Sequence, residues 1–465
     1  MAMKGKLRNQ NKRKKNMNPL THFKKIPILP LLIALALVAL ASPVSATLPP
    51  GNTVQQWNKI AEDTVVGSGA FQAEGYIYMA YTSAAVYDAV VAIEGGFQPY
   101  GPPITAPPGA SVDCAIIEAA YRTLVNYFPS QAVTLGALYA EALSNFGGCT
   151  GDGGGGTLVG QTAATNIIAL RTGDGRMIPI GTTSLFPTLP PAPGVWRLTP
   201  PFAPPQTPWV GSVRPFIVQS LDQFLPDPPP SLQSDEWVEA FDQTKAYGAL
   251  TGSLRSDEQT FIAKFWSANV IRQYNRVGRD VAATRGLSLL DTARLAAMLN
   301  VVAADAMMSK MHAKYHYLFW RPITAINGSL DPSAVTNDGF GPVPGYDDGN
   351  PATVEQAGWR PLLSTPNHPE YPSAHCTLTS AMAEVFSTFL GTNHIDLDIH
   401  GFDPAGPPNN LNAVRHFDMP NDLRQEVINA RIWAGLHYHF SCVAGTVLGR
   451  QVAKFDLKHA FRPAD

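Results

Sequence analysis

Three short clusters of basic and imidazole side chains stand in the C-terminal half of the chain. They lie at residues 314–322, 372–375 and 431–437. Lys314, Arg321 and Arg431 supply three positive charges, while Ser373 and the backbone N–H of Ala374 supply neutral donors. This set suits a compact tetrahedral oxyanion, because guanidinium groups donate forked hydrogen bonds to its oxygens.

Two histidines, His375 and His437, give the same clusters a reactive capacity. One imidazole can attack or ligate the central atom of the anion, while the other moves a proton on an oxygen. Pro372 and Ser373 directly precede a helical pattern, and the free N–H groups at a helix N-terminus bind anions. Taken singly, each piece has a plainer interpretation as a solvated charge, a helix cap or a packed histidine.

Helices must position these residues, since helical periodicity dominates and no strand pattern persists. The predicted helices cover 71–95, 111–128, 131–146, 157–171, a segment from Ser256 past Trp266, one from Ser288 through Val302, 374–390, 422–437 and 441–456. Lys314 and Arg321 share one face if their helix reaches Arg321, where Pro322 favours its end. Arg431 and His437 fall inside helix 422–437. We therefore expect an all-α fold.

The chain divides by composition into four predicted parts. Residues 1–46 carry nine Lys/Arg and no acidic residue, then an apolar stretch too short to span a bilayer. We interpret them as a cleaved signal peptide, with an uncleaved membrane anchor as the alternative, and we see no other run long enough for a span. Residues 186–231 hold fourteen prolines and are predicted to connect the helical halves 47–185 and 232–465.

Export has two consequences for the mature chain. With the basic leader removed, 25 basic and 36 acidic side chains remain, which disfavours a nucleic-acid partner. The four cysteines can then form disulfides, and sequence order suggests Cys114–Cys149 and Cys376–Cys442. The alternative is four buried free thiols.

The motifs Lys-x6-Arg-Pro, Pro-Ser-x-His and Arg-x5-His, in this order, resemble the signature of the vanadium-dependent haloperoxidases. The type 2 phosphatidic acid phosphatases and bacterial acid phosphatases share it. The resemblance implies a helical fold of two bundles and a bound vanadate. It implies that His437 is the axial vanadium ligand, and that Lys314, Arg321, Ser373, Ala374 and Arg431 hold the vanadate oxygens. His375 would then take a proton from hydrogen peroxide, and Lys314 would polarise the bound peroxide so that halide attacks it.

The sequence departs from the family pattern at three positions. Ala374 replaces the usual Gly of Pro-Ser-x-His, and Ala430 replaces the Ser that usually starts the third motif. His368 stands where chloroperoxidases carry Phe and algal bromoperoxidases carry His. This resemblance favours bromide or iodide over chloride, and the alternative for His368 is a histidine in a surface loop.

Three functions stay open at this point. The first is a haloperoxidase that uses vanadate, hydrogen peroxide, halide and a small organic acceptor. The second is an exported acid phosphatase in which His437 forms a phosphohistidine and His375 protonates the leaving alcohol. The third is a binding protein whose catalysis has decayed. Neither the halide, the organic substrate nor the oligomeric state follows from these residues.

Overall fold

The computed structural model describes residues 47–177, 189, 192–199, 204–327, 347–401 and 413–464. The predicted signal peptide 1–46 and part of the proline-rich connection lie outside these ranges. The helices are α1 Thr53–Gly67, α2 Gln72–Glu94, α3 Val112–Tyr127, α4 Ala132–Ser144, α5 Gly155–Leu170, α6 Asp235–Gly248, α7 Asp257–Phe265, α8 Val270–Thr284, α9 Leu289–Tyr317, α10 Pro322–Asn327, α11 Ala374–Leu390, α12 Pro420–Trp433 and α13 His439–His459. A hairpin pairs β1 Leu397–His400 with β2 Val414–Phe417, antiparallel, with Leu397 opposite Phe417. The all-α prediction is confirmed.

Local capping signals set several helix boundaries as expected. Ser256 starts α7 through a capping box with Gln259, and the Ser288 hydroxyl accepts the Asp291 N–H at the start of α9. Gly391 ends α11 with a φ of 67°, the left-handed conformation that glycine adopts without a steric penalty.

Three predicted helix ends are wrong, and two of them move site residues off helices. The α7 helix stops at Phe265 rather than running past Trp266. The α9 helix stops at Tyr317, because Leu318 turns to a φ of 50°, so Arg321 lies in the following loop. The α12 helix stops at Trp433, so His437 lies between α12 and α13 rather than inside a helix. Helices α1, α6, α8 and α10 were not predicted from the sequence.

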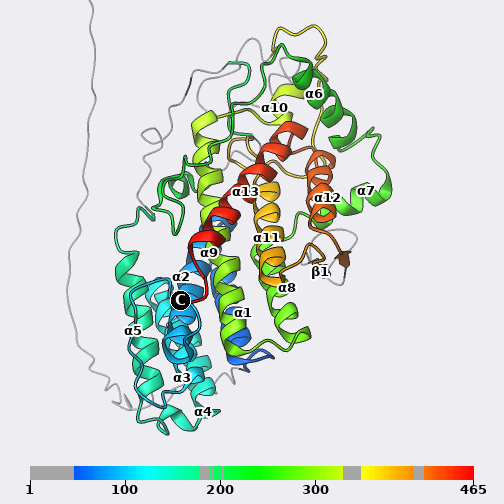
Figure 1. The fold of residues 1–465 in the computed structure, drawn as a ribbon. Helices are drawn as coiled ribbons and strands as arrows, with labels where there is room; N and C mark the ends of the chain where they lie inside the picture. The colour runs from blue at the N-terminus through cyan, green and yellow to red at the C-terminus, as the bar shows by residue number, and fades with distance from the viewer. Residues whose placement is uncertain are drawn as a thin grey trace, which may run out of the picture. The chain divides into compact units, whose positions relative to one another are not determined.

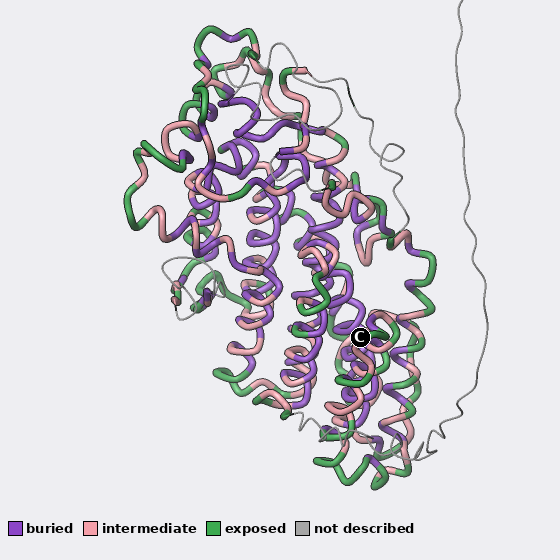
Figure 2. Tube along the Cα trace, turned by 180° about the vertical axis from the view of Figure 1, so that it is seen from behind, coloured by how far each residue is buried: buried purple, intermediate pink, exposed green. Residues whose placement is uncertain are grey.

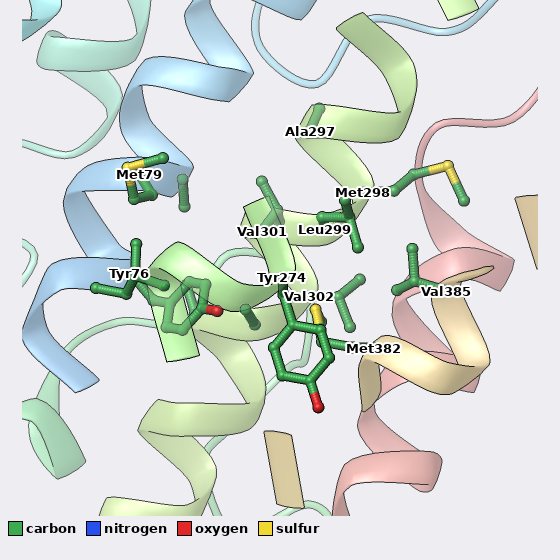
Figure 3. Close-up of a cluster of buried hydrophobic side chains, with 14 of the residues drawn as sticks. Tyr76, Met79, Tyr274, Ala297, Met298, Leu299, Val301, Val302, Met382 and Val385 are labelled. Carbon is green, nitrogen blue, oxygen red and sulfur yellow. The ribbon is translucent and has the colours of Figure 1, made fainter. Parts of the chain in front are cut away.

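The long helix α9 is central to the core of the unit that spans residues Ala46–Asp465 (Figure 1). It packs against α2 from the N-terminal part and against α11 from the C-terminal part. Figure 3 shows Val301 and Val302 of α9 between Tyr76 of α2 and Met382 of α11. The tube in Figure 2 shows buried chain running along the inner helices and exposed chain at the turns. One continuous core therefore supports α9, which carries Lys314.

Glycines bring α11 and α13 into close contact. A Cβ added to Gly449 would lie 1.9 Å from the carbonyl oxygen of Thr377, and one added to Gly445 would lie 2.5 Å from that of Ser373. Larger residues at these two positions would force the helices apart. This close approach fixes Ser373, at the N-terminus of α11, against the helix that follows His437.

One of the two expected disulfides is present. Cys114 of α3 is bonded to Cys149, as the sequence order suggested. The second pairing is wrong: Cys376 and Cys442 are free, buried thiols that interact through a side-chain hydrogen bond. Both thiols lie inside the glycine-mediated contact between α11 and α13, which holds the helices together without a covalent link.

Among the described residues, α2 is the one helix whose length and apolar composition would allow it to cross a membrane. The sequence analysis did not single it out as a possible span. Of its most apolar window, 89% is buried inside the protein, as expected for a core helix.

Asp305 of α9 fastens the proline-rich connection to the core. Its carboxylate is fully buried and accepts the backbone N–H groups of Phe216 and Ile217, each at 2.7 Å, and of Val218 at 3.1 Å. Asp305 therefore holds a connecting segment against the core. The predicted boundaries at 185 and 231 stay predictions.

We expect Asp305→Ala to lower the free energy of unfolding by about 3 kcal/mol, because three buried N–H groups lose a charged acceptor. Urea unfolding measures the change. The matched control is Asp242→Ala, which removes an exposed carboxylate and should change stability by less than about 0.5 kcal/mol. Equal stability of the two variants would contradict the anchoring role.

Candidate oxyanion site

The loop of residues 365–371 is tied to the end of α9 by two buried cations. The Lys314 ammonium donates to the backbone carbonyls of Pro369 at 2.8 Å and Glu370 at 2.7 Å. A lysine ammonium has three N–H groups, so one donor of Lys314 remains. Although Arg321 lies beyond the helix, the turn at Leu318 brings it to the same loop.

Arg321 connects the loop to the segment that carries His437. Its Nε donates to the His368 carbonyl at 3.0 Å and its Nη1 to the Leu436 carbonyl at 2.9 Å. Nη1 also lies 3.3 Å from His437 Nε2, and Nη2 lies 2.9 Å from His368 Nδ1. The guanidinium therefore fixes the positions of both imidazoles.

His437 is oriented by a residue that the sequence analysis did not identify, Glu370. The carboxylate oxygen Oε1 lies 2.6 Å from His437 Nδ1 and also accepts the Tyr438 N–H at 3.2 Å. Because Nδ1 faces a carboxylate and Nε2 faces the donor of Arg321, the proton belongs on Nδ1. A carboxylate partner of this kind fixes the tautomer of a ligating histidine. The Nε2 lone pair therefore accepts from Arg321 in this structure, and Nε2 is the ring nitrogen that could serve as a ligand or a nucleophile.

The chain reaches this geometry at Gly435, just after α12. Gly435 has a φ of 73°, and an added Cβ would lie 2.5 Å from the Gly248 carbonyl oxygen. Only glycine fits this turn. The turn ends α12 and directs His437 toward Glu370.

Ser373 is the residue before α11, but its hydroxyl makes no capping hydrogen bond. Its Oγ and the Nε2 of His375 are buried, and neither has a hydrogen-bond partner among the described residues. The plain interpretation of Pro-Ser as a helix cap therefore does not apply. Ala374 opens the helix and lines the adjacent cavity, so its methyl group does not close the site.

Arg431 approaches from α12. Its Nη1 donates to the Trp266 carbonyl at 3.2 Å, while its buried Nε has no partner within the described part of the chain. Ala430, which stands where the resemblance led us to expect Ser, is fully buried in the core.

A cavity of about 340 Å³ opens beside these groups. Its polar lining includes Lys310, His368, His375, Arg431 and His437. Its apolar lining includes Phe71, Val270, Met307, Leu363, Leu378 and Leu436. His368 is only 3% exposed, so the interpretation of His368 as a surface-loop histidine is wrong. The cavity is a small, mostly apolar chamber whose lining also includes cations and imidazoles.

Burial and positive charge keep the imidazoles neutral. Burial, together with the nearby cations Arg431, Lys310, Lys314 and Arg321, lowers the pKa of His375 well below its ordinary value. Burial and the same kind of neighbours lower the pKa of His437 and of His368. Burial raises the pKa of Glu370 to about 7, against the opposing effect of Lys314 and Arg321. At neutral pH His375 can accept a proton and His437 Nε2 can donate its lone pair.

The residues present fit a vanadate or phosphate group. Lys314, Arg321 and Arg431 are buried cations, and Glu370 is the carboxylate that hydrogen-bonds into their cluster. Buried charges without counter-charges are unfavourable, and a tetrahedral oxyanion would neutralise them. It would also satisfy Ser373 Oγ, His375 Nε2 and Arg431 Nε, which are three of the buried atoms that lack partners among the described residues.

The structure brings all eight sequence-predicted site residues to one place: Lys314, Arg321, His368, Ser373, Ala374, His375, Arg431 and His437. Their individual roles stay predictions. The sequence analysis missed Glu370 and Lys310. Glu370 stands directly before Tyr371-Pro372-Ser373, so an acidic residue next to the motif was a usable signal. Lys310 stands four residues before Lys314, on the same helical face.

We expect Glu370→Gln to weaken orthovanadate binding by about 10- to 100-fold. A carboxylate that is hydrogen-bonded to a ligating histidine sets the orientation and the basicity of its imidazole. Titration calorimetry with orthovanadate measures the effect. The control is Glu384→Gln, which removes a carboxylate that pairs with Arg424 and does not line the cavity. If both variants bind vanadate as tightly as the unaltered protein, Glu370 does not act on His437.

Comparisons with known proteins show which proteins this chain resembles. The family model for the VCPO second helical-bundle domain matches residues 294–465. The vanadium chloroperoxidase of Curvularia inaequalis is 27% identical over 304 residues. That match covers 52% of this chain and 47% of the relative, so it spans about half the length of the curated protein.

Solved structures share the fold over most of the chain. A bacterial vanadium-dependent iodoperoxidase superposes with a TM-score of 0.71 at 20% identity, over 90% of this chain and all of that one. An apo-type bacterial vanadium-dependent chloroperoxidase gives a TM-score of 0.63 at 16% identity, over 83% and 94% of the two chains. At these identities the likeness shows the fold.

Proposed function

Because the chain belongs to the vanadium haloperoxidase family, we propose that it is an exported enzyme that oxidises bromide or iodide with hydrogen peroxide. Vanadate is the cofactor and a small organic molecule accepts the oxidised halogen. One observation carries the proposal: Arg431 Nε and His375 Nε2, which are buried without partners among the described residues, belong to side chains that line the same cavity as His437, whose imidazole Glu370 orients. The N-terminal basic and apolar pattern, outside the described residues, supports export.

In this proposal each residue of the site has a role in binding vanadate or in moving a proton. His437 Nε2 would hold the metal, and the third N–H of Lys314, the Arg431 guanidinium and the Ser373 hydroxyl would bind the vanadate oxygens. Bound vanadate supplies a Lewis-acidic centre that activates peroxide without a change of oxidation state. His375 Nε2 would accept the peroxide proton, since its lowered pKa leaves it unprotonated. The apolar walls of the cavity limit water around the reacting groups.

The choice of halide rests on His368. The imidazole lines the cavity beside Arg321 and is almost fully buried. A buried, neutral imidazole in place of an aromatic hydrocarbon adds a polar group to the side of the cavity where the halide would enter. This supports bromide or iodide as the substrate.

The test compares two activities of the purified protein after removal of bound metal and anions. One sample receives orthovanadate and is assayed for bromide and iodide oxidation with hydrogen peroxide. A parallel sample without vanadate is assayed for phosphate ester hydrolysis. Vanadate-dependent halide oxidation is expected. Ester hydrolysis that vanadate inhibits, without halide oxidation, would instead support the acid phosphatase, and the absence of both activities would support decayed catalysis.

A further inference from the structure

A second lysine of α9 faces the same cavity. Lys310 is fully buried, lines the cavity, and its Nζ has no hydrogen-bond partner among the residues that the structure describes. It stands one helical turn before Lys314, whose ammonium is occupied by the carbonyls of Pro369 and Glu370. Lys310 matches none of the three sequence motifs. It therefore lies outside the oxyanion cradle, by which we mean Lys314, Arg321, Ser373, Ala374, Arg431 and His437.

The surroundings of Lys310 differ from those of the cradle. Met307, on the preceding turn of the same helix, lines the cavity with it, as do Phe71 and Leu378. The Lys310 ammonium makes no hydrogen bond to the described residues, so it offers a charged point without a fixed set of donors around it. A tetrahedral oxyanion needs several donors, whereas a large monovalent anion that sheds its water easily needs little more than the charge.

The charge of Lys310 reaches both cavity histidines. Lys310, His368 and His375 line the same cavity, and the charge of Lys310 lowers the pKa of both histidines. Burial and Arg321 lower the pKa of Lys310 itself to about 7. An anion beside the ammonium would offset this burial penalty and favour the charged form.

We propose that Lys310 is a halide-binding residue, which holds iodide or bromide in the apolar part of the cavity beside the vanadate cradle. This inference rests on the proposed function, because it assigns the position of the second substrate. A weakly hydrated halide loses the least hydration free energy on entering an apolar chamber. Lys310 should therefore bind iodide more tightly than bromide, and bromide more tightly than chloride.

The test uses Lys310→Met, which keeps the length and removes the charge, with Lys310→Arg to restore charge and Lys454→Met as a control at an exposed lysine. In the vanadate-loaded enzyme, Lys310→Met should raise the KM for iodide about tenfold or more. The KM for hydrogen peroxide and the affinity for orthovanadate should stay within about threefold. Lys310→Arg should recover part of the iodide affinity.

A second measurement needs no turnover. Crystals of the phosphate-loaded protein soaked in iodide should show an anomalous iodide peak in contact with Lys310 Nζ, absent in Lys310→Met. An unchanged KM for iodide, or loss of orthovanadate affinity in Lys310→Met, would overturn the assignment. If the protein oxidises no halide yet shows the iodide peak, the proposed function fails while anion binding at Lys310 stands.

Discussion

His437→Gln is expected to abolish halide oxidation and to weaken orthovanadate binding by more than about 100-fold. This loss exceeds the one expected for Glu370→Gln, which removes only the carboxylate that orients the imidazole. The reason is that the Nε2 lone pair, held toward the cavity by Glu370 at 2.6 Å from Nδ1, is the group that would bond to the metal. Gln can still donate to Glu370, so the buried carboxylate keeps a partner and the fold is preserved.

Phosphate provides the matched comparison, because ionic and hydrogen-bonding contacts hold it without coordination. His437→Gln should therefore weaken phosphate binding by less than about tenfold. The control His439→Gln alters an exposed histidine two residues along and should change neither affinity. Parallel calorimetric titrations with the two anions measure the difference. If vanadate and phosphate affinities fall by the same factor, His437 is not a metal ligand.

His375→Ala is expected to lower kcat by about 10²- to 10⁴-fold, the usual contribution of a general acid–base group. The Nε2 of His375 is buried without a partner in the described residues, and burial with nearby cations keeps it unprotonated. Orthovanadate affinity should fall by less than about tenfold, since one hydrogen bond is lost. Steady-state kinetics in hydrogen peroxide and iodide measure kcat and both KM values.

Added imidazole separates a proton-transfer role from a packing role for His375. The adjacent cavity of about 340 Å³ has room for a free imidazole where the side chain was removed. Exogenous imidazole should therefore restore part of the activity of His375→Ala, and imidazole should leave His437→Gln inactive. A normal kcat in His375→Ala would exclude the residue as the proton acceptor.

The sequence predicted most of the fold because the helices carry local signals. Ser256, Ser288 and Gly391 mark helix ends through their own side chains or backbone freedom. His437 was placed in a helix because periodicity continues beyond the true end of α12, whereas the sequence left open whether the helix that carries Lys314 reaches Arg321. Those ends depend on a left-handed turn at Leu318 and on the contact of Gly435 with Gly248, and a contact between residues so distant in sequence leaves no periodic pattern.

The residues of the candidate site also fall into those that the sequence predicts and those that only the structure identifies. The eight predicted residues are recognisable by motif, whereas Glu370 and Lys310 gain their importance from three-dimensional neighbours. A glutamate before Tyr371-Pro372 is ordinary until its carboxylate is found 2.6 Å from His437. The predicted Cys376–Cys442 disulfide is wrong because sequence order alone does not show whether two neighbouring cysteines are bonded, and both are free thiols in the structure.

The most direct test of the central claim is a crystal structure of the protein soaked in orthovanadate, with the metal located by its anomalous scattering. We expect vanadium within bonding distance of His437 Nε2, and its oxygens within hydrogen-bond distance of Ser373 Oγ, Arg431 Nε and the Lys314 ammonium. Vanadium bound elsewhere, or no vanadium at this site under saturating conditions, would contradict the account.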